Sequence, residues 1–137
     1  MFGLSTSEER TLCSLNTPQK IQDYLNSIPA NFEKGGDTCY SPRLVLRERM
    51  AHCMEGAMFA AAALRLAGHP PIVFELKSFR DDQDHVLALF QQGGCWGAIS
   101  KTNHAVLRYR EPIYKSLREL AMSYFHEYFL DDGRKTL

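Results

Sequence analysis

Residues 53–67, CMEGAMFAAAALRLA, restrict the fold of this chain more than any other segment. Only Glu55 and Arg65 carry charge here, so a helix over these residues has no polar face. A helix of this kind is buried on most of its sides. Gly68 and the pair Pro70-Pro71 follow directly, and these residues favour the end of a helix. We therefore predict a buried central helix from Cys53 to Ala67.

The segments around this helix predict its partners. Thr17-Pro18 and Ser41-Pro42 are typical of helix starts, because the hydroxyl caps free amides and proline fits the first turn. Gly93-Gly94 favours a hairpin turn. Strands are predicted at 71–77, 85–90, 95–100 and 105–109, and a last helix is predicted to open at Pro112. The order predicts an α+β fold, in which the central helix packs on a small antiparallel sheet between N- and C-terminal helices.

Length and charge limit the class of protein. With 137 residues the chain is expected to be a single domain, 1–137, in which residues 1–15 form a loose arm. Sixteen Lys and Arg balance sixteen Asp and Glu, so no excess positive charge is available for nucleic acid or an acidic membrane. The longest apolar run, Gly56 to Leu64, is too short for a membrane span of about 20 residues. Without a signal-peptide pattern we expect a cytoplasmic protein.

A cysteine nucleophile is suggested by the position of Cys53 at the start of the central helix. Free amides and the helix dipole favour a thiolate there, and the thiolate is the reactive form. Such a nucleophile also needs a base to take its proton. The candidate is His85, which heads a predicted strand after a polar loop. Taken alone, either residue is more often structural than catalytic.

The order of several short motifs strengthens this pair. They are, along the chain, Cys53-x-Glu55-x-Ala57, Leu64-Arg65, Gly68, His85 and Trp96. Over about residues 40–103 this arrangement resembles the transglutaminase-like superfamily of papain-like cysteine enzymes. The resemblance implies that Cys53 is the nucleophile and His85 the base. It also implies a peptide or a small amide or ester as substrate, with no cofactor and no metal.

The third catalytic position departs from that family, which has an Asp where this chain has Ser100. A hairpin centred on Gly93-Gly94 would place Ser100 and Thr102 on the face of His85, whereas a three-residue loop would bring Asn103 there instead. Ser100 is our predicted third residue. Its hydroxyl can orient the imidazole but cannot stabilise the imidazolium as a carboxylate does. The charge of Asp82 or Asp84 is a weaker alternative, since both lie in a polar loop.

Two other functions stay open. A catalytically silent relative would bind a peptide or partner in the same cleft, and the missing Asp favours this. A metal site would draw on Cys39, His52, Cys53 or His85, but zinc ligands usually come in closely spaced pairs and only His52-Cys53 is close. The oligomeric state is left open.

Several neighbouring residues are expected to have structural roles. We predict that Glu55 is the N3 residue of a capping box whose N-cap is His52. The four cysteines, Cys13, Cys39, Cys53 and Cys95, are expected to be thiols. A disulfide between Cys39 and Cys53, and an oxyanion donor at or near Tyr40, are further alternatives.

Overall fold

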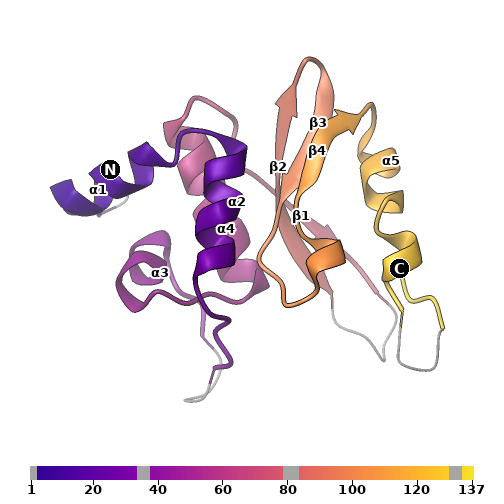
Figure 1. The fold of residues 1–137 in the computed structure, drawn as a ribbon, viewed down its shortest axis with the longest axis horizontal. Helices are drawn as coiled ribbons and strands as arrows, with labels where there is room; N and C mark the ends of the chain where they lie inside the picture. Colours follow the sequence, from indigo (N-terminus) through magenta and orange to yellow (C-terminus); the bar gives the residue numbers. More distant parts are fainter. Residues whose placement is uncertain (1–2, 34–37, 79–83, 130–133) are drawn as a thin grey trace.

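The computed structural model describes residues 3–33, 38–78, 84–129 and 134–137, and it has the predicted α+β fold (Figure 1). The helices before the sheet are α1 (Thr6–Ser14), α2 (Pro18–Ser27), α3 (Pro42–Glu48) and α4 (Cys53–Leu66). The strands are β1 (Ile72–Leu76), β2 (His85–Gln92), β3 (Cys95–Ile99) and β4 (Arg110–Tyr114). A 3-10 turn, η1 (Ala105–Leu107), precedes β4, and α5 (Leu117–Met122) and η2 (Phe125–Glu127) follow it.

The helices begin where their capping residues predict. The side chains of Thr17 and Ser41 accept hydrogen bonds from amides in the first turns of α2 and α3, and each helix opens with a proline. The central helix α4 begins at Cys53 and ends at Leu66, with Ala67 as its C-cap. These three helix starts are set by local chemistry, so the sequence is sufficient to locate them.

The sheet separates two layers of the molecule. Its four strands are antiparallel in the order β1-β2-β3-β4. The helices α1 to α4 lie on one side and α5 on the other (Figure 1). Ala88 and Phe90 of β2 belong to the core shared with the first group, while Leu87 and Leu89 belong to the core shared with α5. Consecutive residues of β2 therefore face different layers.

Helix α4 is the buried centre that its composition predicts. Nine of its 14 residues are buried, among them Phe59, Ala60 and Leu64. At Gly56 the side chain of Lys101 crosses so closely that an added Cβ would lie 2.4 Å from the Lys101 Cβ. A glycine at this position allows Lys101, two residues after β3, to pack directly on the helix.

The β2–β3 hairpin has the register predicted from its glycine pair. Gln92 pairs with Cys95 and Ala88 with Ile99, so the turn consists of Gly93 and Gly94 alone. Both glycines have positive φ, +60° and +78°, which a two-residue hairpin turn of this kind requires. The three-residue alternative is thereby excluded.

Three sequence predictions were wrong, one before α2 and two after β3. The expected loose arm contains helix α1, which has a Ser5 capping box and buries Leu12. Residues 105–107 form a 3-10 turn rather than part of a strand. Pro112 lies inside β4 instead of opening a helix, and the last helix starts at Leu117 with Ser116 as its cap. Because β4 is an edge strand, it tolerates a residue without an N–H donor.

We compared the helices with the length and apolar character that a membrane-spanning helix needs. Within the described ranges, none of them is both long and apolar enough to cross a bilayer.

Candidate active site

A cavity of about 700 Å³ lies where the start of α4 comes near the start of β2. The wall is completed by residues after α2, before α4, after β3, in η1, and in and after η2. The lining residues include Asn31, Phe32, His52, Cys53, Asp84, His85, Lys101, Thr102, Asn103, His104, Val106, Glu127 and Phe129. Both members of the predicted pair, Cys53 and His85, are thus on the wall of one cavity.

Cys53 is the first residue of α4 and is partly exposed. At this position its thiol lies beside backbone amides that have no partner within the helix. Cys39, which is exposed, and Cys53 are both free, so the disulfide that the sequence left open is not formed.

His85 is the first residue of β2 and only 6% of its surface is exposed. Burial, and to a smaller extent the nearby charge of His104, lower the pKa of its imidazole to about 4. The ring is therefore neutral at physiological pH. Its Nε2 atom is buried and has no hydrogen-bond partner among the described residues. In the described part of the chain, no hydrogen bond joins the ring to the Cys53 thiol.

Strand geometry is the reason that no hydrogen bond joins the two side chains among the described residues. Side chains alternate between the two faces along a strand, so His85 lies on the same face of β2 as Leu87 and Leu89, which pack toward α5. Helix α4, with Cys53 at its start, packs on the opposite face of the sheet. The two residues approach the cavity from different layers.

Ser100, the predicted third residue, has another partner. It is fully buried, and its hydroxyl donates to the Leu107 carbonyl oxygen at 2.7 Å. Its backbone N–H and C=O pair with the side-chain amide of Gln22 at 2.9 and 2.8 Å. The structure therefore ties Ser100 to η1 and α2, and no hydrogen bond among the described residues links it to His85.

The other residues considered for the third position are placed differently. Thr102 and Asn103 line the cavity together with His85. Asp84 also lines it, but its carboxylate accepts hydrogen bonds from the backbone and hydroxyl of Ser78. Asp82 lies outside the described residues. Of the residues considered for the third position, Thr102 and Asn103 thus line the cavity with His85 and lie outside the polar loop.

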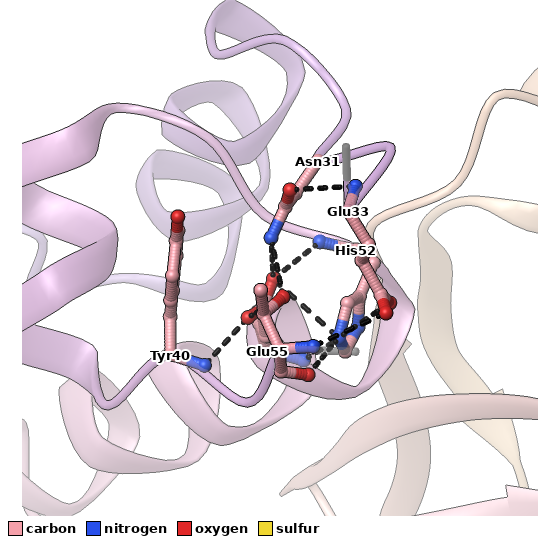
Figure 2. A network of polar contacts seen from close by, with 6 residues as sticks. Asn31, Glu33, Tyr40, His52 and Glu55 are labelled. Carbon is pink, nitrogen blue, oxygen red and sulfur yellow. Dashed lines mark hydrogen bonds and ion pairs between the residues drawn. The ribbon is translucent and has the colours of Figure 1, made fainter. Parts of the chain in front are cut away.

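The most developed polar network of the site lies under the start of α4 (Figure 2). Its centre is Glu55, which is fully buried. One carboxylate oxygen accepts from Asn31 Nδ2 at 2.9 Å and from the His52 backbone at 3.0 Å. The other accepts from the Thr38 hydroxyl at 3.1 Å and from the Tyr40 backbone at 2.5 Å. The network joins the segment before α3 to the helix that carries Cys53.

The charge of Glu55 is maintained by these contacts. Burial by itself would raise the pKa of this carboxyl group. Hydrogen bonds from the backbone of His52, from Asn31 and from the backbone of Tyr40 oppose burial and hold the pKa below its ordinary value. The carboxylate is therefore an ionised buried acceptor, and Tyr40 donates its amide to this group rather than to the cavity.

His52 caps the helix, as the sequence predicts. Its Nδ1 accepts the Glu55 backbone N–H at 3.4 Å, completing the predicted capping box. Its Nε2 lies 3.0 Å from the Thr38 carbonyl oxygen, which can only accept, so we place the proton on Nε2. Both ring nitrogens thus have partners, which leaves His52 unsuited to act as the base for Cys53.

Lys101 is a site residue that the sequence analysis did not find. It is 7% exposed, and its ammonium group donates to the Leu25 and Ile28 carbonyl oxygens at 2.9 and 2.5 Å. These carbonyls lie at the C-terminal end of α2, where a positive charge is stabilised. Burial, and then the nearby Arg108, lower the pKa of Lys101. No local pattern predicts this contact, because the lysine and its acceptors are far apart in sequence.

Neither a search for metal ligands nor a comparison with known proteins changes the interpretation of this site. Among the described residues, no group of three or more His, Cys, Asp or Glu side chains is placed to hold a metal ion. The chain matches no model of a known protein family and no curated protein. The site is therefore interpreted from its own geometry.

Proposed function

We propose that this protein is a cysteine-nucleophile enzyme of transglutaminase-like type, which transfers an acyl group from an amide or ester to water or an amine. One observation carries the proposal. The partly exposed Cys53 thiol stands at the N-terminus of a buried helix and lines a cavity of about 700 Å³ that His85 also lines.

In the proposed reaction the Cys53 thiol gives its proton to the His85 imidazole, and the sulfur attacks the substrate carbonyl carbon. The resulting imidazolium protonates the leaving amine or alcohol as the carbon–heteroatom bond breaks, which leaves a thioester on Cys53. Water or an amine then attacks the thioester and restores the thiol. A ring with a pKa of about 4 is a weak base, so we expect slow turnover.

A second candidate is a catalytically silent domain of the same type, which binds a ligand in the cavity. It is favoured by the hydroxyl of Ser100, which is bonded to the Leu107 carbonyl, and by the absence of a hydrogen bond from any described residue to His85 Nε2. An imidazole without an orienting partner is a poor general base.

Thiol labelling distinguishes the two candidates. Iodoacetamide at pH 6 to 7, followed by mass mapping, should label Cys53 faster than the exposed Cys13. His85→Ala should slow labelling of Cys53 about tenfold, because the imidazole then no longer takes the thiol proton as the sulfur attacks the reagent. The matched control is His126→Ala, because His126 is exposed and does not line the cavity.

Acyl transfer itself is tested with an activated ester. Incubation with p-nitrophenyl acetate should give an acetylated protein by intact mass, and Cys53→Ser should abolish this species. If Cys53 is labelled no faster than Cys13 and forms no acetyl adduct, the silent domain is the better description.

A further inference from the structure

The mouth of the cavity has exposed apolar side chains. Phe32, Val106 and Phe129 all line it, with 72%, 53% and 49% of their surfaces exposed. They come from three separate parts of the chain, namely the segment after α2, η1 and the segment after η2. Large apolar side chains that gather at a cavity and remain in contact with water are typical of a ligand-binding surface.

The charges of the wall favour an uncharged ligand. Among the described lining residues, the lysine or arginine side chain is that of Lys101. Its ammonium group donates to two carbonyl oxygens at the end of α2. Asp84 and Glu127 supply carboxylates. Lys135, whose ammonium group lies 5.0 Å from the Phe129 ring centre, donates to the His126 carbonyl oxygen. Among the described residues, a ligand carboxylate would therefore meet like charges on the wall, while the ammonium groups of Lys101 and Lys135 already have acceptors.

A polar contact for the ligand is present as well. Only 6% of the His85 surface is exposed, and within the described part of the chain its Nε2 has no hydrogen-bond partner. A buried polar atom without a partner is uncommon in proteins and costs free energy. An uncharged amide or ester can satisfy such an atom and still place an apolar group on the rim.

We infer that the acyl donor of this site is an uncharged amide or ester whose acyl group is apolar, and that Phe32, Val106 and Phe129 bind that group. This inference rests on the proposed function, because it names the substrate class of the same cavity. It goes further in excluding substrates with a carboxylate next to the reacting carbonyl.

Three electrophiles of different character test the inference on the full chain. Bromoacetamide is the reference, N-benzyl-bromoacetamide adds an apolar group, and bromoacetate adds a negative charge. Each reacts by the same step, in which the thiolate sulfur forms a bond to carbon and bromide leaves. Rates at each cysteine are measured by mass mapping, and the exposed Cys13 gives the intrinsic reactivity of each reagent.

We expect the benzyl reagent to react about tenfold faster than bromoacetamide at Cys53, once each rate is divided by that at Cys13. This is the effect of removing about half of a phenyl group from water. Bromoacetate should be slower than bromoacetamide by the same comparison. The double variant Phe32→Ser/Val106→Ser should lower the benzyl preference, expressed as the ratio of the benzyl rate to the bromoacetamide rate at Cys53, to about twofold or less.

Ile113→Ser is the matched control for the double variant Phe32→Ser/Val106→Ser, which we call the rim variant because both residues lie at the mouth of the cavity. Ile113 is 64% exposed, lies on β4 and does not line the cavity, so its removal should leave the benzyl preference unchanged. Phe129 is left intact because the Lys135 ammonium lies 5.0 Å from its ring centre. Circular dichroism verifies that the variants are folded.

The inference is overturned if the benzyl preference at Cys53 equals that at Cys13, if the rim variant retains it, or if bromoacetate is favoured. Failure of the proposed function gives a different result. In that case bromoacetamide labels Cys53 no faster than Cys13 and His85→Ala has no effect, whatever the benzyl preference is.

Discussion

Replacing Glu55 by Gln should destabilise the fold by about 2–4 kcal/mol. The carboxylate accepts four hydrogen bonds, two on each oxygen. A glutamine keeps one oxygen and places an NH₂ group where the other stood, so two donors lose their acceptor. An unpaired buried donor costs about 1–3 kcal/mol, and we use the lower part of this range because some of the donors are only partly buried.

Rotation of neighbouring groups does not remove this cost. If the Asn31 amide turned to accept from the new NH₂ group, its oxygen would lose the Glu33 backbone N–H that it accepts at 3.0 Å. The backbone amides of His52 and Tyr40 cannot turn without disturbing the start of α4 and the segment before α3. The network therefore has no second arrangement that satisfies all its donors.

Urea unfolding followed by circular dichroism at pH 7 measures the effect. Glu48→Gln is the matched control, because Glu48 is exposed, and it should change the free energy of unfolding by less than about 0.5 kcal/mol. Thr38→Val removes one donor from the network and should cost about 1 kcal/mol. The difference between Glu55→Gln and the wild type should shrink as the pH falls below 4.5, because the pKa of Glu55 is lowered in the folded state. A Glu55→Gln variant as stable as the Glu48→Gln control would refute the argument.

Three further predictions concern the contacts around the cavity. Gly56→Ala should lower stability by about 1–3 kcal/mol despite the better helix propensity of alanine, because its Cβ would overlap Lys101; a thermal midpoint at or above that of the wild type would contradict this. Since the pKa of His85 falls from 6.5 unfolded to about 4 folded, stability should decrease by roughly 3 kcal/mol between pH 6.5 and pH 4; His85→Leu should remove this part of the pH dependence in urea titrations. Gln22→Leu should cost about 2–4 kcal/mol, because the buried backbone N–H and C=O of Ser100 lose their partners; equal urea midpoints would rule this out.

The parts of the fold that were predictable have local causes. The apolar run after Cys53 has no polar face, so burial of α4 follows from composition alone. Hydroxyl caps followed by proline mark α2 and α3, and Gly93-Gly94 defines the hairpin turn. In each case the residues that decide the structure are within a few positions of one another.

The predictions that were wrong concern segments whose structure depends on distant partners. The sequence from Pro112 onward fits a helix, but pairing with β3 makes its first residues a strand. Residues 1–15 lack a strong periodic pattern, and α1 is held by burial of Leu12 in the core. In the site, the role of Ser100 stays a prediction, and strand parity could not reveal that its polar atoms are bonded to Leu107 and Gln22.

The attachment of α2 to the end of β3 has a consequence for the order of folding. Gln22 is bonded to a residue 78 positions away, and Lys101 reaches a carbonyl 76 positions back. Closing a loop of that length before other contacts exist carries a large entropic cost, so the β-hairpin and α4 are expected to form first. During synthesis α2 leaves the ribosome well before Ser100 and Lys101 do. Helix α2 is then incompletely packed until the sheet has formed. The φ-values of folding at Gln22 should therefore be close to zero.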